Sequence, residues 1–281
     1  MPAILRGLQE GGFVVGRNVA IEHRFADGHN DRLPALAAEL VQRKVNVIFA
    51  NTTPPAYAAK AATSTIPIVF TTGVDPVEVG LVASMNRPGG NVTGVTFLSN
   101  KLVAKRLELL SAVVPAGAPI GMLAAQRNPN TGTDVRDALA AAQTIGRTLH
   151  VESVPPEGGI EVNLANLLRH RIGAVFVAPQ ADFRMWSQQL VLLAARHALP
   201  TSFSSGDYVT AGGLMSYGPD QMDSYREAGV YTGRVLKGEK PAELPVMVAT
   251  KFEFMINLKT AKVLGITISP AMLVLATSVV E

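Results

Sequence analysis

The sequence predicts an α/β fold built from two doubly wound parallel sheets. Short β-branched runs alternate with amphipathic helical patterns, and the strand-to-strand period of roughly 25 to 30 residues is the one that βαβ units need. Strand candidates such as VNVIFA and GAVFVA are continuously apolar, which indicates sheets covered on both faces. A chain of 281 residues fills two ordinary domains better than one, so we expect two lobes.

Eight segments carry the strand pattern. The first, NVAIEHRF, places Val19, Ile21, His23 and Phe25 on one face. The other seven, in chain order, are VNVIFA, IPIVFT, NVTGVTF, PIGMLAA, LHVESV, GAVFVA and LPTSFS.

Helical periodicity fills the intervals between these strands. The segment NDRLPALAAELVQR repeats leucine at 33, 36 and 40, and KLVAKRLELLSAV carries a stripe through Val103, Leu107 and Leu110. DVRDALAAAQTIGRTL and RMWSQQLVLLAARHA have the same spacing, and Trp186 occupies a stripe position that predicts core packing.

Composition and charge exclude several classes of protein. The chain is 48% hydrophobic and 17% charged, as in a globular protein with a large core. No apolar run reaches the roughly 18 to 20 residues that cross a bilayer. The absence of cysteine excludes disulfides and thiolate sites. The net charge of +3 is small and the cations are scattered, which argues against a nucleic-acid partner.

Five polar loops follow predicted strands, and they form the candidate site because ligands of open α/β sheets bind outside the carboxyl ends of the strands. Their amides and hydroxyls can hold a carboxylate, and an aspartate can bind an ammonium group. Ser, Thr and Asn before a helix equally serve as caps, and this alternative stays open. The loops are Asn51 to Pro55, Thr71 to Pro76, Gln126 to Asn130, Pro179 to Asp182 and Ser204 to Tyr208.

Signatures of common enzyme classes are missing. The sequence has no GxSxG elbow, HExxH motif or P-loop, and the glycines of RPGGNVTG lead into a strand rather than a helix. The five histidines lack metal-ligand spacing. We assign His23 to a strand face, and His170 and His197 to helix C-termini. No catalytic residue, cofactor or metal is predicted.

Six longer blocks follow one another along the chain: GRNVAIEHRFADGHNDRLPALAAELV, TIPIVFTTGVDPVEVGLVASMNRPGGNVTGVTFL, KRLELL, AGGLMSYGPD, GRVLKGEKPAELPV and KFEFMINLKTAKVLG. Together they resemble the substrate-binding proteins of ABC transporters, in the branch that includes tryptophan and phenylalanine binders. The resemblance runs from about Gly7 to the last residue. Six blocks in the right order are far more specific than any one of them.

The resemblance implies a type I periplasmic-binding-protein fold, with two lobes joined by a three-strand hinge. Lobe one would comprise residues 1–97 and 216–245, and lobe two residues 98–215 and 246–281. The loop PQADF departs from the more hydroxyl- and amide-rich loop of aromatic-amino-acid binders, which leaves the ligand open. The implied ligand-binding residues, with Thr71 added from its loop, are Thr52, Thr53, Thr71, Thr72, Gly73, Asp75, Thr96, Phe97, Asn128, Gln180, Asp182, Asp207 and Tyr208.

The N-terminus departs from the family pattern. Family members usually begin with a signal peptide, followed by a strand and loop before the helix that starts here at AILRGLQEGG. Neither is present in the given sequence. We therefore expect a truncated N-terminus, and a gap in the sheet of lobe one between NVAIEHRF and VNVIFA.

The predicted function is the solute-binding component of an ABC importer, which captures a small carboxylate-bearing ligand between closing lobes without turnover. An amino acid is expected, and Phe97, Phe183, Tyr208 and Tyr217 favour an aromatic one as stacking walls. The expected partner is a membrane permease, and the expected state is a monomer that is periplasmic or anchored outside the cytoplasm. Two alternatives remain: the effector-binding domain of a transcriptional regulator, and a Rossmann-like enzyme.

Overall fold

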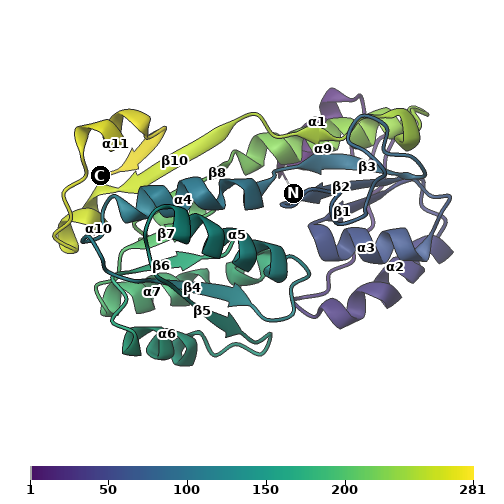
Figure 1. The fold of residues 1–281 in the computed structure, drawn as a ribbon. Coiled ribbons are helices and arrows are strands. Elements are labelled where there is room, and N and C mark those ends of the chain that lie inside the picture. Colours follow the sequence, from purple (N-terminus) through teal and green to yellow (C-terminus); the bar gives the residue numbers. More distant parts are fainter. Residues whose placement is uncertain (1) are drawn as a thin grey trace. The chain divides into compact units, whose positions relative to one another are not determined.

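The computed structural model describes residues 2–281, with all side chains except those of residues 100 and 181. The chain forms two compact units. Unit 1 comprises Met1–Leu98 and Asp220–Lys251, and unit 2 comprises Ser99–Pro219 and Phe252–Glu281. Each unit is a sheet with helices on both faces, which confirms the predicted α/β class (Figure 1).

Unit 1 is built on a four-stranded parallel sheet of order β1-β2-β3-β9. Its elements are α1 (Pro2–Glu10), η1 (Asn30–Arg32), α2 (Leu33–Gln42), β1 (Ile48–Asn51), α3 (Thr53–Ala62), β2 (Ile68–Thr72), β3 (Val92–Thr96), α9 (Gln221–Leu236), η4 (Pro241–Glu243) and β9 (Met247–Val248).

Strand β2 shows why this sheet is covered on both faces. Ile68 and Phe70 point to one face, where they join a core with residues of α3 and with partly buried side chains of α2. Val69 points to the other face and packs against Tyr231 of α9. All three strand residues are fully buried, as the continuously apolar sequence of this strand predicts.

Helices α1 and α9 pack unusually closely, and glycine makes this possible. A Cβ atom on Gly7 would lie 1.9 Å from the carbonyl oxygen of Arg226, and one on Gly229 would lie 2.2 Å from that of Ile4. Any side chain at these positions would push the helices apart. The beginning of the chain is therefore fastened to a helix more than two hundred residues later.

Unit 2 contains a seven-stranded sheet of order β11-β10-β8-β7-β6-β4-β5, in which only the β8–β10 pair is antiparallel. Its elements are η2 (Ser99–Leu102), α4 (Val103–Ser111), β4 (Ile120–Ala125), α5 (Thr131–Thr144), β5 (Leu149–Val154), α6 (Ile160–Arg169), β6 (Ala174–Val177), η3 (Ala181–Arg184), α7 (Ser187–Arg196), β7 (Thr201–Phe203), α8 (Gly206–Thr210), β8 (Met215–Pro219), β10 (Phe252–Asn257), α10 (Leu258–Val263), α11 (Pro270–Leu275) and β11 (Ser278–Val280).

The strand order of unit 2 reverses between β4 and β6. Helices α4 and α5 cover one face of the sheet, and α6 and α7 cover the other (Figure 1). Because β4 and β6 are adjacent while their following helices lie on opposite faces, the loops after these two strands diverge and leave the topological switch point at which open sheets bind ligands.

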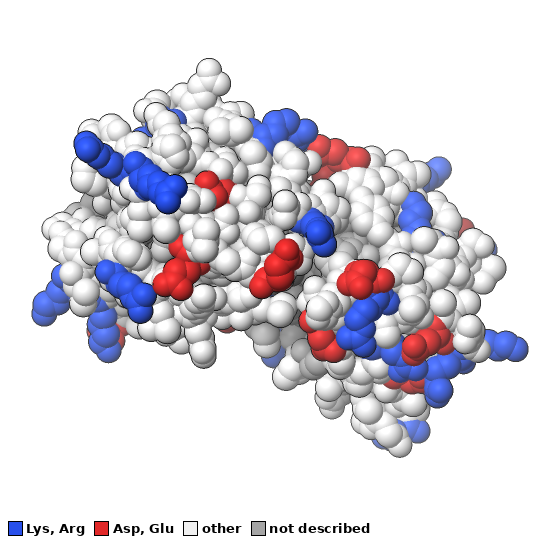
Figure 2. Space-filling model, turned by 90° about the horizontal axis from the view of Figure 1, so that it is seen from below, with Lys and Arg blue, Asp and Glu red and all other residues white. Residues whose placement is uncertain are grey.

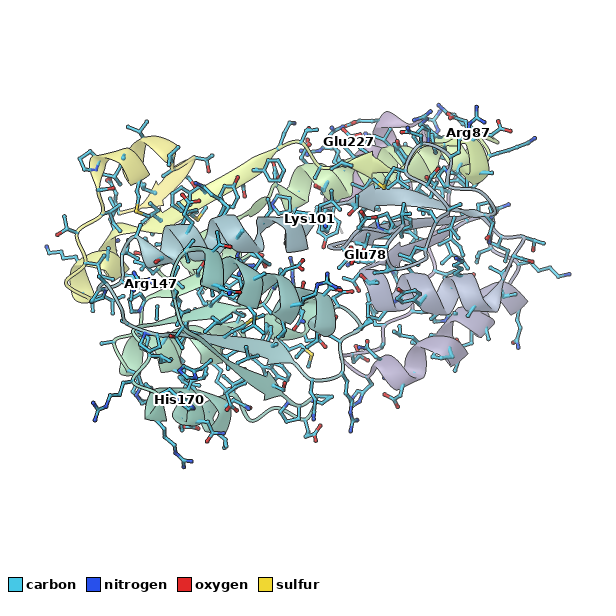
Figure 3. All side chains as sticks on the ribbon, in the orientation of Figure 1. Glu78, Arg87, Lys101, Arg147, His170 and Glu227 are labelled. Carbon is cyan, nitrogen blue, oxygen red and sulfur yellow. The ribbon has the colours of Figure 1, made fainter. Side chains whose placement is uncertain are left out.

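One arginine ties the end of α4 to the rest of unit 2 (Figure 3). The Arg147 side chain donates to Ser111 Oγ at 2.6 Å, to the Ser111 carbonyl at 2.9 Å and to the Pro115 carbonyl at 2.7 Å. These carbonyls belong to the last turn of α4 and the chain just after it, where a cation also complements the helix dipole.

Seven of the eight predicted strands form, and the prediction for residues 18–25 is wrong. This segment has no ladder, and the only pairing nearby is an isolated bridge between Val15 and Val19. Strand β1 lies at the end of the unit 1 sheet among the described residues, so no strand is available to pair with the segment. Phe25 is consequently 63% exposed, and it stacks on His23 instead of packing in a sheet. Strands β8, β9, β10 and β11 are not among the eight predicted segments.

Candidate functional site

The carboxyl ends of β1, β2 and β3, with the residues that follow them, form the first candidate region, which we name the unit 1 edge. The parallel register aligns Asn51 with Thr71, and Thr72 with Thr96. Thr53 begins α3 at the same edge, and its Oγ1 lies 2.7 Å from Thr72 Oγ1. Thr71 Oγ1 donates to Asn51 Oδ1 at 2.9 Å. The fold thus brings the predicted threonines close together at the unit 1 edge.

The hydroxyl groups of the unit 1 edge bond mainly to one another and to the main chain. Thr96 Oγ1 donates to the Val74 carbonyl at 2.8 Å, and Thr72 Oγ1 lies within 3.4 Å of the Val74 amide. Thr71, Thr72 and Thr96 are all fully buried. In this state of the molecule these three side chains shape the loops rather than present their hydroxyls to solvent.

The start of α3 differs from an ordinary helix N-terminus. Thr52 has φ 78° and ψ 168°, a region that is populated almost only by glycine. Pro54 and Pro55 occupy the first turn and have no N–H group. The helix therefore offers fewer free amides to an anion than a usual N-terminus, and we expect carboxylate recognition at this edge to depend less on main-chain amides.

The remaining predicted residues of unit 1 are also engaged. Asp75 Oδ1 accepts hydrogen bonds from the amides of Val77 and Glu78, at 2.9 and 3.3 Å, and closes the turn that begins two residues after Gly73. Phe97 is 8% exposed and makes an edge-to-face contact with Tyr225 of α9, with ring centroids 6.0 Å apart.

The second candidate region, the unit 2 edge, comprises the carboxyl ends of β4, β6 and β7 with the residues that follow them. Gln180 is its centre. Its Oε1 accepts from the Ala125 amide at 2.6 Å, and its Nε2 donates to Thr131 Oγ1 at 2.9 Å and to Asp134 Oδ2 at 3.0 Å. Gln180 is 4% exposed, and it joins the ends of β4 and β6 across the switch point.

Two further predicted residues meet at this edge. Asn128 Nδ2 donates to Asp182 Oδ2 at 2.5 Å, and Asn128 Oδ1 accepts from the Asn130 amide at 2.9 Å. The loop after β4 and the short helix η3 after β6 are thereby linked by side chains. Asp182 is half-buried, so part of this residue is accessible to solvent.

Aromatic rings stack where β7 ends. Tyr208 of α8 lies on Phe203 with ring centroids 4.4 Å apart and 5° between the planes. Burial raises the pKa of the Tyr208 hydroxyl to about 12, so this group stays protonated at neutral pH. Its neighbour Asp207 is exposed.

Two of the predicted stacking walls have other roles. Phe183 is fully buried in the hydrophobic core of unit 2, so the proposed stacking contact for this residue is not supported. Tyr217 of β8 is half-buried and stacks on Phe252 with centroids 6.4 Å apart. Trp186 packs against the unit 2 core, as its stripe position predicts.

The sequence interpretation missed two ionisable residues of the unit 2 edge. Arg106 of α4 and Asp134 of α5 are each 1% exposed. Burial lowers the pKa of Arg106 to about 9 and raises the pKa of Asp134 to about 7. The signal was available, because helical periodicity puts residue 106 on the same stripe as Val103 and Leu110, where a charged side chain must be buried.

Other classes of site find little support in the described part of the chain. No three histidine, aspartate or glutamate residues among residues 2–281 lie close enough to hold a metal ion. No helix there combines the length and apolarity that a membrane span needs. On the face shown in Figure 2, cationic and anionic side chains are interspersed, without a broad region of one sign.

Comparison with known proteins identifies close structural relatives. The chain is 29% identical over 262 residues to a tyrosine-binding protein of Clostridioides difficile, which covers 92% of this chain and 74% of that protein. A Streptococcus pneumonia ABC domain solved in complex with L-Trp is 28% identical, with a TM-score of 0.87 over 99% of this chain and 96% of the other. A conserved domain protein of Vibrio cholerae is also 28% identical, with a TM-score of 0.89 over 99% and 93%.

The family profile described as "ABC transporter substrate binding protein" matches residues 2–280. This match spans almost the whole chain and agrees with the type I periplasmic-binding-protein fold of the solved relatives. It favours the transport interpretation over the regulator and the Rossmann-like enzyme. The chain belongs to the family of ABC transporter substrate-binding proteins.

Proposed function

We propose that this protein binds an aromatic L-amino acid, tyrosine or tryptophan, and delivers it unchanged to an ABC permease. The observation that carries the proposal is the similarity, over at least nine-tenths of the chain, to one relative named for tyrosine binding and to another solved with L-Trp. The two units would be the two ligand-binding lobes, and the unit 1 and unit 2 edges would supply the contacts.

The groups at the two edges suit the three parts of such a ligand. The carboxylates of Asp182 and Asp207 are candidates for the ammonium group, because both retain access to solvent. The stacked Tyr208 and Phe203 rings are buried, so a ligand ring would extend this stack only when the residues that cover the rings move. Neutral hydroxyl and amide groups then fix orientation, as is usual in small-molecule sites.

Binding without turnover follows from the same assignment. The family profile and the tyrosine-binding relative both describe binding proteins. The proposed mechanism is a population shift, in which a ligand that contacts both units stabilises one conformation over the other. The protein would act outside the cytoplasm as a monomer and without nucleic acid.

A thermal-shift and calorimetry screen tests the proposal. L-Tyr, L-Trp, L-Phe and L-Leu are each added to the purified protein, with D-Tyr as a stereochemical control. A ligand present at about 100 times its dissociation constant adds about 2.7 kcal/mol of stability, which is a readily measured shift in Tm. Mass spectrometry of the recovered ligand checks that it is unchanged.

A matched pair of variants places the ring of the ligand. Tyr208→Phe keeps the stacked ring and removes only the hydroxyl, whereas Tyr208→Leu removes the ring. We expect the first to bind L-Trp within about threefold of the parent and the second to lose about 1 kcal/mol or more of binding free energy. If no natural amino acid shifts the Tm of the parent protein, the proposed ligand class is wrong.

A further inference from the structure

Arg106 is the most completely buried large side chain of unit 2 that carries a charge. It lies one turn into α4, is 1% exposed, and its guanidinium sits 4.3 Å above the centre of the Phe176 ring. Nη2 donates to the Val177 carbonyl at 2.5 Å, with a longer contact of 3.4 Å to the Ser202 carbonyl. These main-chain contacts fix one end of the guanidinium at the carboxyl ends of β6 and β7.

The other two nitrogen atoms are not satisfied. Nε and Nη1 of Arg106 are buried and have no hydrogen-bond partner in the described part of the chain. A buried donor without a partner costs about 1 to 3 kcal/mol, and more when the group is charged. Such a residue is therefore expected to have an acceptor in at least one functional state of the protein.

The protein supplies only a partial counter-charge. The acid that acts on Arg106 electrostatically is Asp134, but no salt bridge joins the two side chains in the structure. Asp134 is itself held by Gln180, and burial favours its neutral form up to about pH 7. The other ionisable neighbour of Arg106 is Tyr208, which carries no charge at neutral pH because burial raises its pKa to about 12. A positive charge thus remains under-compensated at the unit 2 edge.

The position of this charge links it to ligand binding. Val177 ends β6, and Ser202 lies in β7 next to the residue that ends that strand, so Arg106 reaches the edge at which sheets of this topology hold their ligands. Asp134, Gln180 and Tyr208 belong to the same edge. Strand β4 borders the switch point on the other side. Its last residue, Ala125, donates its main-chain amide to Gln180 Oε1.

We propose that Arg106 is the residue of unit 2 that recognises the negatively charged group of the ligand, a carboxylate. This inference rests on the proposed function, and it adds the residue that distinguishes an amino acid from the corresponding amine. Because Nη2 is taken by main-chain carbonyls, the carboxylate is held by single N–H···O bonds to Nε or Nη1 rather than by a two-pronged fork. The side chain is buried, so the residues that cover it must yield locally when the carboxylate arrives.

The test compares ligands that differ only in the carboxylate. Binding of L-Trp and tryptamine, or of L-Tyr and tyramine, is measured by calorimetry at about pH 6, where Asp134 is mostly neutral, for the parent protein, Arg106→Met and Arg106→Lys. Arg196→Met is the matched control, because it removes one arginine from an exposed position on α7. Thermal melting of each variant checks that it is folded.

We expect Arg106→Met to weaken L-Trp or L-Tyr binding at least tenfold, with Arg106→Lys intermediate and Arg196→Met unchanged. Binding of the amine is expected to be weak in the parent and unaltered in Arg106→Met. Should Arg106→Met not fold, the amino-acid preference of Arg106→Lys over the amine must still fall relative to the parent. Amino-acid binding that both Arg106 variants leave at the parental affinity overturns the inference alone, whereas a parent protein that binds no amino acid overturns the proposed function.

Discussion

The unit 1 edge and the unit 2 edge lie at the same topological position in their sheets but are built from different chemistry. Apart from Asp75, whose carboxylate accepts hydrogen bonds from two main-chain amides, the first is a set of neutral threonines and one asparagine whose hydroxyl and amide groups bond to one another and to the main chain. The second contains a buried cation, a buried acid and a central glutamine. Neutral groups lose little when they satisfy each other, whereas an under-compensated charge gains much from a ligand of opposite sign.

This difference predicts which edge governs stability and which governs the effect of pH. Substitutions in the unit 2 edge leave buried charged groups or hydrogen-bond donors without a partner in a region that excludes water. Substitutions in the unit 1 edge remove a neutral hydrogen bond at most. The following four changes test the comparison.

Gln180→Leu is expected to have the largest effect. It leaves the Ala125 amide, Thr131 and Asp134 without their shared partner in a buried region. The expected loss is about 3 to 5 kcal/mol in the free energy of unfolding, measured by urea titration. Gln180→Glu is the matched variant, because it keeps the acceptor for the Ala125 amide but loses the donor to Asp134. A loss below about 1 kcal/mol for Gln180→Leu would show that the unit 2 edge does not depend on this network.

Asp134→Asn is expected to change how stability varies with pH. Burial raises the pKa of Asp134 from 3.8 to about 7, so the folded state binds the proton more tightly than the unfolded state. The stabilising contribution is complete below about pH 4 and is lost as the pH rises to about 7.

The stability of the parent relative to Asp134→Asn should therefore fall by about 2 to 4 kcal/mol between pH 4 and pH 8, since one pKa unit corresponds to about 1.4 kcal/mol. Urea titrations at the two pH values give this difference, in which other titrating groups largely cancel. An unchanged difference between the two proteins would contradict the assigned pKa.

Thr72→Val tests the neutral edge. The substitution keeps the shape of the side chain and removes the hydroxyl that contacts Thr53 Oγ1 and the Val74 amide. We expect a loss of about 1 to 2 kcal/mol in the free energy of unfolding, equal at pH 5 and pH 8 because no ionisable group is involved. A loss that varies with pH would remove the contrast between the two edges.

Thr52→Gly is expected to have the smallest effect and the opposite sign. The positive φ of Thr52 is costly for a β-branched residue and free for glycine. Relief of this strain should exceed the extra entropy of glycine in the unfolded chain and raise the stability by up to about 1 kcal/mol, visible as a higher Tm. Ala58→Gly, in the middle of the same helix, is the control and should be destabilising. A lower Tm for Thr52→Gly would mean that the side chain of Thr52 contributes more than the strain costs.

The sequence predicted the sheets better than the site. Continuous apolar runs determine buried strands almost without context, and seven of the eight predicted strands form. The prediction of a strand at NVAIEHRF was wrong, because alternation shows only which side chains a strand would bury. It does not show whether a neighbouring strand exists to pair with the segment. Such pairing is a property of the sheet and cannot be read from one segment.

The site was predicted as loops, and the loops do lie at the carboxyl ends of their strands. The sequence did not show that Thr71, Thr72 and Thr96 bond within the edge, because hydrogen-bond partners depend on register. Arg106 was overlooked because the segment KLVAKRLELLSAV, which forms α4, was interpreted only from its apolar stripe. A charged residue on such a stripe is itself a signal of a buried functional group.

The fastening of α1 to α9 has a consequence for biosynthesis. Unit 1 needs residues from both the first ten and those near 230, so the ribosome completes all of Ser99–Pro219 before the last helix of unit 1 can dock. Until then α1 lacks the helix against which its glycine packs. Nascent chains of this protein therefore remain incompletely folded for most of their translation.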